Sequence, residues 1–424
     1  MSINKCIDAG TFLKSLDQQK SSQAWLAEIQ DEALSTLKSE GFPTKKVELW
    51  KYTGVEAIVE SSFSLAKDAA SVLFTPVPDT YSIVFVDGVF SESLTDTSGI
   101  SDGVTIKTLG DAFEENARAV KQALSEAPND CSDAFTHLNR AFMSNGVFIE
   151  VDKNTAVDKP LHIVNIGTRE NAVSMNRNII VLNSGAELEI FEDFITDGGA
   201  KTFSNPVTDI HLSKNSILRH VKNQSQNDSS FHIASIRVTQ ERDSSYYSTV
   251  LTCGSAISRL NIDTELNDEN ASCDFKGLYA IKGSQLADNH TVMNHNAART
   301  FSDQLYKGIL DERSRGVFNG KVFIARDSQQ VESSQLNKNL MLSKNARIDT
   351  KPELDVYADD VKAAHGAAIG QLNEEELFYI QSRCISKDDA MAMLVHGHME
   401  EIISSVKSAS IREYLENIYL DLFS

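Results

Sequence analysis

The sequence predicts a mainly β protein, a parallel β-helix core flanked by helical regions at both ends. From Gly146 to Tyr357, short segments such as GVFIEV, LHIVNI and FKGLYAI alternate apolar and polar residues, which is typical of strands. Polar turns rich in Gly, Ser, Asn and Asp separate them, and these units recur roughly every 13 to 18 residues. Helical periodicity dominates before and after this stretch.

Three architectures fit such a recurrence: a sandwich, a propeller or a β-solenoid. The aromatic or Trp-Asp signature of propeller blades is missing. Hairpin turns of the Asn-Gly type occur only at Asn145-Gly146 and Asn319-Gly320, which disfavours an up-and-down sandwich. Polar residues such as Gln335, Asn337 and Asn339 suit stacked coils, where side chains pair with neighbours above and below. We therefore favour a β-helix.

Residues 1–145 form a mainly helical N-terminal region with one short β-hairpin. We expect one helix to begin after Ser22, another at the capping pattern Asp-x-x-Glu that opens with Asp111, and a third near Ser132. Between them, SIVFVDGVF is a hairpin signal, because Asp87-Gly88 suits a tight turn with left-handed backbone.

We expect residues 358–424 to form a C-terminal helical region. Asn373 and Ser386 are N-cap residues, each followed three positions later by an acidic residue, and each precedes an apolar helical pattern. The segment SIREYLENIYLDLF forms the last helix. A helical cap is expected at the end of a solenoid, since an open coil edge would otherwise aggregate.

The bulk composition describes a globular protein: 41% of the residues are hydrophobic and 24% are charged. The net charge of −20 argues against binding to nucleic acid or to anionic lipid, which need clustered Lys and Arg. We find no apolar run of transmembrane length and no signal-peptide pattern. The five cysteines are scattered and form no CxxC pair, so we expect reduced thiols in a cytoplasmic protein.

Two histidine pairs are weak metal candidates. The offset of five between His290 and His295 puts them on opposite faces of a strand, and neither has a Cys or Glu at ligand spacing. His396 and His398 lie two apart on an expected helix and face different directions. Structural roles are the simpler interpretation of all four.

The chain carries no P-loop, GxGxxG, GxSxG or HExxH motif. A carbohydrate-cleaving β-helix enzyme would line one groove with carboxylates, and Asp311-Glu312-Arg313 and Asp359-Asp360 could contribute to one. Ordinary turns explain these residues equally well. We therefore expect a protein without enzymatic activity.

His365 is the remaining candidate. It stands among Ala and Gly residues in DDVKAAHGAAIG, and only Lys362 and Asp359-Asp360 are near it in sequence as polar partners. A neutral imidazole is a good metal ligand. A packed structural histidine fits the same residues, and the two interpretations stay open at this point.

Three blocks of the sequence resemble the SufB/SufD family of the SUF iron–sulfur cluster assembly system. They are ELWKYT near the N-terminus, QLYKGILDERSRGVFNGKVFI, and HGAAIGQLNEEELFYIQSR followed by SKDDAMAMLVHGHMEEII. The blocks span nearly the whole chain and keep the order that they have in the family. Chain length and the HGA form point to the SufD branch rather than the longer, cysteine-rich SufB branch.

The resemblance implies a right-handed parallel β-helix and a scaffold subunit that is not an enzyme. Such a subunit pairs with SufB through the β-helix and holds the ABC-type ATPase SufC through its C-terminal helical region. The nascent iron–sulfur cluster forms at the SufB–SufD interface. No cofactor is then expected to bind stably to this chain alone, and a homodimer is expected when the chain is isolated.

The resemblance also implies site residues. His365 matches the histidine of the family's SHGAT motif and becomes a cluster-assembly and metal candidate that shares its site with the partner chain. For the ATPase contact we select Phe378, Tyr379 and Arg383, because aromatic and Arg side chains concentrate in interface hot spots. The alternative for the two aromatic residues is that they cap the β-helix core. Relatives often carry a cysteine two positions before the histidine, where this chain has Ala363.

Two other functions stay open. One is a SufB-like scaffold that binds iron–sulfur or flavin directly, although only Cys253 and Cys273 lie in the expected β-helix, too few for a four-thiolate site. The other is a β-helix carbohydrate enzyme. The sequence does not say which β-helix residues face SufB, or whether the isolated chain binds iron.

Overall fold

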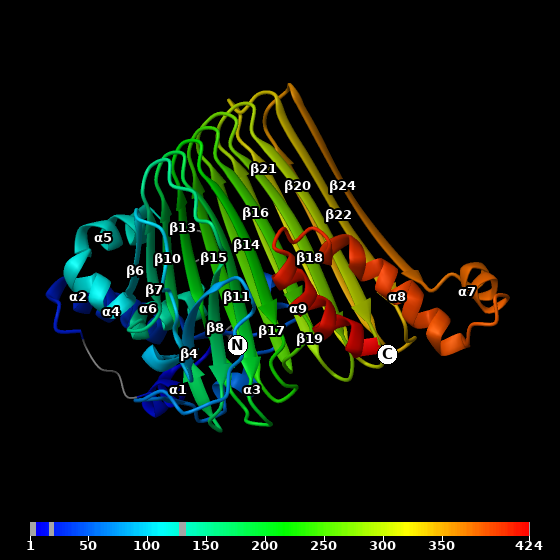
Figure 1. The fold of residues 1–424 in the computed structure, drawn as a ribbon, viewed down its shortest axis with the longest axis horizontal. Helices are drawn as coiled ribbons and strands as arrows, with labels where there is room; N and C mark the ends of the chain where they lie inside the picture. The colour runs from blue at the N-terminus through cyan, green and yellow to red at the C-terminus, as the bar shows by residue number, and fades with distance from the viewer. Residues whose placement is uncertain (1–5, 17–20, 127–132, 424) are drawn as a thin grey trace, which may run out of the picture.

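The computed structural model describes residues 6–16, 21–126 and 133–423, and it confirms the parallel β-helix (Figure 1). From β13 to β24, successive strands alternate between a twelve-stranded and a ten-stranded sheet, and neighbours in a sheet come from successive turns of the chain. The pairs from β7 to β24 in the two stacks are parallel and in continuous register, as in β20–β22 and β22–β24. Each turn therefore stacks directly on the one before.

The ten-stranded sheet consists, in spatial order, of β24 (Val361–Gln371), β22 (Val331–Met341), β20 (Phe301–Leu310), β18 (Ser272–Ile281), β16 (Ser245–Thr252), β14 (Ile217–Gln224), β11 (Glu187–Thr196), β8 (Leu161–Gly167), β4 (Tyr81–Val86) and β5 (Val89–Phe90).

The main path of the twelve-stranded sheet consists of β23 (Arg347–Val356), β21 (Arg315–Ile324), β19 (Leu286–His295), β17 (Ile257–Leu266), β15 (Phe231–Gln240), β13 (Val207–Leu212), β10 (Arg177–Leu182), β7 (Val147–Val151) and β6 (Val104–Thr108). Three short strands join it at the side: β3 (Ser64–Leu65), β9 (Ala172–Ser174) and β12 (Phe203–Ser204). A separate pair is formed by β1 (Cys6–Ile7) and β2 (Phe42–Pro43).

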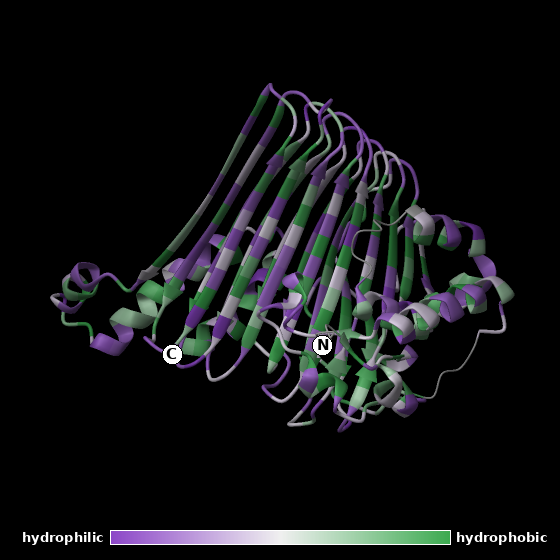
Figure 2. Cartoon of the chain, turned by 180° about the vertical axis from the view of Figure 1, so that it is seen from behind, coloured by the Kyte–Doolittle hydropathy of each residue, from purple (hydrophilic) through white to green (hydrophobic). Residues whose placement is uncertain are grey.

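The main hydrophobic core lies inside the solenoid, between the two sheets. Ile190, Ile210 and Phe318, from β11, β13 and β21, belong to this core. Figure 2 shows hydrophobic and hydrophilic residues alternating along the strands, as expected for side chains that point in turn to the interior and to an outer face. Register therefore decides which polar residues enter the interior.

Helices of the N-terminal region cover one end and part of the outer face of the twelve-stranded sheet (Figure 1). They are α1 (Gly10–Ser15), α2 (Ala24–Glu40), α3 (Glu56–Val59), α4 (Leu109–Glu115), α5 (Ala117–Glu126) and α6 (Ala134–Phe142), with short 3₁₀ turns at Glu48–Trp50 and Glu92–Leu94. Phe135 of α6 packs with Phe42 and Phe203 in a cluster of aromatic rings.

Two predicted helix starts are wrong. The N-cap of α2 is Gln23 rather than Ser22, and it makes no capping hydrogen bond through its side chain. The N-cap of α4 is Thr108, whose hydroxyl accepts a hydrogen bond from the backbone N–H of Asp111, so Asp111 lies within the first turn. Ser132, the third predicted start, lies outside the described residues.

The predicted limits of the core do not coincide with the limits of the sheets. The Asp87-Gly88 hairpin forms, with both residues in the left-handed region, but its strand β4 pairs in parallel with β8 and so belongs to the solenoid. At the other end, β24 lies beyond residue 357 and continues the ten-stranded sheet. Local sequence patterns identify a hairpin or a strand, but not the distant strand with which it pairs.

Three helices follow β24: α7 (Glu374–Gln381), α8 (Lys387–Ile403) and α9 (Ala409–Leu420), with a 3₁₀ turn at Asp421–Phe423. α9 and the second half of α8 pack on the outer face of the ten-stranded sheet through residues such as Met399 and Leu415. α7 lies away from both sheets (Figure 1). None of the helices in the described parts of the chain is long and apolar enough to cross a membrane.

Candidate functional site

The solenoid ends in two edge strands, β23 and β24. β24 pairs with β22 on one side, and no strand among the described residues pairs with its other side. An edge of this kind presents unpaired backbone N–H and C=O groups in a row. The exposed positions of β24 are mostly small, because the strand reads VKAAHGAAIGQ.

His365 lies on this last strand and faces the interior side of the solenoid. It is in register with Gln335 on β22, and residues in register on parallel strands project to the same face. Gln335 faces the interior, since a Cβ added to Gly320 of the opposite sheet would lie 2.1 Å from its Nε2 atom. His365 is exposed only because no further turn stacks on it.

Beneath His365, amide side chains form a hydrogen-bonded row. Gln335 Nε2 donates to Gln304 Oε1 at 2.6 Å, and Gln304 Nε2 donates to Thr291 Oγ1 at 2.7 Å. Gln335 Oε1 is buried and has no hydrogen-bond partner among the described residues. The row positions the amide of Gln335 under the imidazole and leaves this one acceptor free.

The neighbours of His365 on its own strand leave space around the ring. Ala363 and Ala367 project to the same side, two positions away in each direction. Lys362, which is close in sequence, projects to the other face, where its Nζ atom lies 2.6 Å from Glu332. Within the described ranges, no group of three or more His, Cys, Asp and Glu side chains is placed to hold a metal ion.

The two cysteines of the β-helix lie away from this end. Cys253 and Cys273 are both buried, and burial raises the pKa of both thiols, that of Cys253 to about 12. Thiols with raised pKa values stay protonated and are poor ligands and nucleophiles. Cys253 follows β16 and Cys273 lies on β18, so the structure does not bring either cysteine together with His365 on β24.

Phe378, Tyr379 and Arg383 lie together on and just after α7. Phe378 is 73% exposed and Tyr379 is 60% exposed. Arg383 Nη2 donates to Tyr379 Oη at 2.7 Å, and its guanidinium lies 5.1 Å from the centre of the tyrosine ring. The alternative in which the two aromatic residues cap the β-helix core is wrong, since no residue of α7 is buried.

The turn between α7 and α8 contains Cys384 in the left-handed conformation, with φ of 63°. This position after a helix end favours glycine, because a Cβ there is strained. The thiol is exposed. The N-caps of both helices are confirmed: the side chains of Asn373 and Ser386 accept hydrogen bonds from backbone N–H groups of α7 and α8.

Sequence reasoning missed a buried polar cluster that anchors the ELWKYT segment to the twelve-stranded sheet. Asp288 accepts hydrogen bonds from Thr53 Oγ1, from Arg259 Nη1 at 2.7 Å, and contacts His290 Nε2 at 2.9 Å. The guanidinium of Arg259 lies 3.9 Å from the centre of the Trp50 ring. The motif itself was visible in the sequence, but its partners are distant.

A second missed cluster lies inside the solenoid. Glu192 is fully buried and lies 3.5 Å from both Lys222 Nζ and His220 Nε2. Burial lowers the pKa of Lys222 to about 8, although Glu192 opposes this change. For Glu192, burial raises the pKa, but Lys222 and His220 outweigh burial and hold it well below the usual range. Lys222 balances the charge of Glu192, and the cluster lies several turns away from the open end.

Comparison with known proteins identifies two family regions. A model described as "SUF system FeS cluster assembly, SufBD core domain" matches residues 165–398, which include His365 and α7. A model described as "SufBD protein N-terminal region" matches residues 14–163. Together they cover most of the chain.

Individual relatives agree with these matches. The chain is 30% identical to the iron–sulfur cluster assembly protein SufD of Escherichia coli over 392 residues, which cover 90% of this chain and 89% of the relative. It is 30% identical over 396 residues to the SufBD family protein slr0076 of Synechocystis, covering 90% and 87%. It is 28% identical over 416 residues to the chloroplastic protein ABCI7 of Arabidopsis thaliana, covering 95% and 87%.

Proposed function

We propose that this chain, which belongs to the SufB/SufD family and is similar to SufD, is a scaffold subunit without enzymatic activity that helps to form clusters where it meets a SufB-type partner. Its role in SUF iron–sulfur cluster assembly follows from the family. The observation that carries the finer proposal is the position of His365, which faces inward yet is exposed, on the last strand of the solenoid, whose outer side pairs with no described strand.

The edge strands supply the means of pairing. A second β-helix that brings its own last turn against β24 would satisfy the open backbone groups and bury His365 between the two chains. The small side chains of Ala363 and Ala367 allow close approach of that partner. A SufB-type homologue is the expected partner, and a second copy of this chain takes its place when the chain is isolated.

The cluster, or the iron that forms it, is the cargo of this interface rather than a resident cofactor. A neutral imidazole of His365 would supply one iron ligand or one proton-transfer group. Its neighbours on this face are amide and alkyl side chains, so the thiolates would come from the partner. Cys253 and Cys273 do not serve this purpose, because both are buried as protonated thiols.

The arm formed by α7 and the first half of α8 is the proposed contact for a SufC-type ATPase. Phe378, Tyr379 and Arg383 are of the types that dominate interface energies, and all three are exposed. Because β24 leads into α7 through only Leu372 and Asn373, a movement of the bound ATPase would act directly on the strand that carries His365.

We also propose a reducing, cytoplasmic setting. The described cysteines Cys6, Cys253, Cys273 and Cys384 are all free thiols, which suits a compartment that keeps thiols reduced.

The test is affinity isolation of the tagged, full-length chain from its own host, with partners identified by mass spectrometry and iron quantified. The proposal expects a longer homologue and an ABC-type ATPase to be recovered with the chain. Recovery of the chain without any ATPase or homologue, and without iron, would contradict it.

A further inference from the structure

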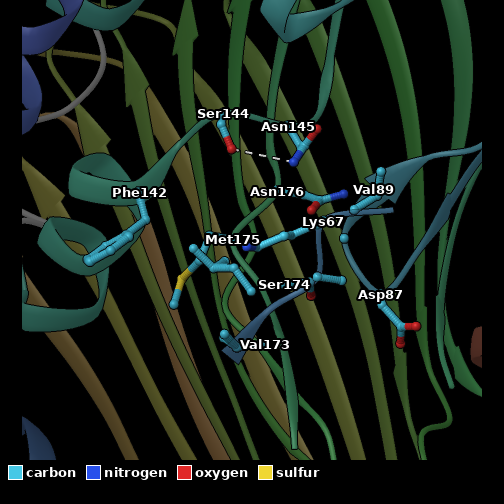
Figure 3. A pocket seen from close by; sticks show the side chains of 13 residues that line it. Lys67, Asp87, Val89, Phe142, Ser144, Asn145, Val173, Ser174, Met175 and Asn176 are labelled. Atoms are coloured by element: carbon cyan, nitrogen blue, oxygen red, sulfur yellow. Dashed lines mark hydrogen bonds between the residues drawn. The ribbon is translucent and has the colours of Figure 1, made fainter. Parts of the chain in front are cut away.

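A cavity of about 360 Å³ lies at the end of the molecule opposite to His365. It is bounded by the β4–β5 turn, the end of α6 and the segment that follows β9 (Figure 3). Its size falls in the range of pockets that bind small molecules, which begins at about 300 Å³. None of its lining residues belongs to the cluster-assembly site described above.

One wall of the cavity is apolar and the other is polar. Phe142, Val173 and Met175 provide the apolar wall. On the polar wall, Ser174 is the first residue of a row of hydrogen-bonded side chains. Its hydroxyl donates to Ser204 Oγ at 3.3 Å, and Ser204 Oγ also accepts a hydrogen bond from Gln226 Nε2 at 3.0 Å. The cavity therefore suits a small ligand with both an apolar and a polar side.

Lys67 supplies a positive charge to the cavity. Figure 3 shows its side chain extending across the cavity toward Met175. Asp87 also lines the cavity, but its carboxylate is occupied: Oδ1 accepts from the backbone N–H groups of Thr168 and Arg169, and Oδ2 accepts from the Thr168 hydroxyl. Lys67 makes no ion pair with any residue that the structure describes, so its charge is available to a ligand.

Asn176 supplies an unused acceptor. The residue is 2% exposed, and its Nδ2 atom donates to Asn165 Oδ1 at 3.2 Å, while its Oδ1 atom has no partner among the described residues. Gly88 lies next to this atom, and its backbone is in the left-handed region, with φ of 84°. A Cβ at Gly88 would lie 3.2 Å from Asn176 Oδ1 and 2.9 Å from the Cβ of Ser174, so glycine keeps this side of the cavity open.

We propose that this cavity binds a small organic anion that also carries a hydroxyl group, of the hydroxy-acid class. The anionic group pairs with the Lys67 ammonium, the hydroxyl donates a hydrogen bond to Asn176 Oδ1, and the carbon skeleton lies against Phe142 and Met175. A buried acceptor without a partner is costly, and a donor from the ligand removes that cost. The site is independent of the proposed cluster-assembly role.

The test uses isothermal titration calorimetry on the full-length protein with three probes. D-glycerate carries both the charge and the hydroxyl groups, propionate carries only the charge, and glycerol carries only the hydroxyl groups. We expect glycerate to bind at least about tenfold more tightly than either of the others, since it alone satisfies both groups of the cavity.

Two variants separate this cavity from general binding. Lys67→Met removes the charge at an exposed position and keeps the length of the side chain, so the fold is retained; it should weaken glycerate binding about tenfold or more. Lys153→Met, at an exposed lysine outside the cavity, should leave binding unchanged. Equal binding of propionate and glycerate, no heat from any probe at concentrations of about 10 mM, or unchanged binding in Lys67→Met would overturn the proposal.

Discussion

His365 and Gln335 occupy the same register position on adjacent parallel strands, and both side chains face the interior side of the solenoid. Gln335 is buried and bound to Gln304, whereas His365 is exposed because the stack of turns ends there. The stack of turns therefore ends with an interior-facing side chain, His365, that is exposed to solvent. A homologous turn from another chain would continue the stack and enclose the imidazole.

The buried cluster around Asp288 predicts a large loss of stability in Arg259→Ala. Removing the guanidinium leaves the Asp288 carboxylate buried with fewer partners and removes the stacking on Trp50. We expect the free energy of unfolding to fall by about 3 to 5 kcal/mol, measured by urea denaturation.

The matched control is Arg242→Ala. Arg242 pairs with Asp268 and Glu269 at the surface, where ion pairs contribute less than about 1 kcal/mol. Equal losses in the two variants would show that the Asp288 cluster does not anchor the N-terminal segment.

Acid destabilisation is predicted from His295. Burial lowers its pKa from 6.5 to about 4, and its two ring nitrogens contact the hydroxyls of Thr300 and Ser302. Below pH 6.5 the unfolded chain binds a proton that the folded chain does not bind until about pH 4, so stability falls as the pH falls through this window. At about pH 5, His295 alone lowers the free energy of unfolding by about 2 kcal/mol.

The check compares urea denaturation at neutral pH and at about pH 5 for the parent, His295→Gln and His396→Gln. His295→Gln should lose about 2 kcal/mol less than the parent on acidification. His396→Gln, changed at a half-buried position on α8 outside the proposed interfaces, should behave as the parent does. The same loss in all three proteins would exclude His295 as a source of acid sensitivity.

The proposed ATPase contact predicts loss of binding without loss of stability. Phe378→Ala and Tyr379→Ala should each weaken binding of the SufC-type ATPase about tenfold or more, as hot-spot residues do. Their melting temperatures should not change, because both side chains are exposed. Leu73→Ala, at a fully exposed apolar residue far from α7, is the control; a similar weakening in this variant would argue against a specific contact.

The β-helix could be predicted because its signals are local. Turn residues that adopt the left-handed conformation, among them Asn270 and Gly283, recur between segments with a period of two. The pairing of polar residues between stacked turns was also predictable: Gln335 Nε2 donates to Gln304 Oε1 on the neighbouring strand at 2.6 Å. Such repeats indicate a fold in which each turn contacts only the neighbouring turns.

The features that could not be predicted depend on contacts between residues far apart in sequence, or on a helix start that is displaced by one turn. Thr53 and Asp288, which form a hydrogen bond, are 235 positions apart. At α4, Thr108 and Asp111 both have capping oxygens and bond to each other, so the pattern fits two starts one turn apart. The sequence leaves Phe378 open between a partner contact and a cap on the β-helix core, and only the fold shows that its helix lies away from the sheets.

The most direct test of the proposed role measures iron and acid-labile sulfide in the complex purified with its SufB-type and SufC-type partners, comparing the parent chain with His365→Ala. His137→Ala, on α6 near the other end of the solenoid, is the histidine control. We predict that His365→Ala assembles the complex with unchanged stability but loses most of its iron and sulfide, while the control keeps both. Full iron and sulfide content in His365→Ala would contradict a role for this histidine in forming the cluster.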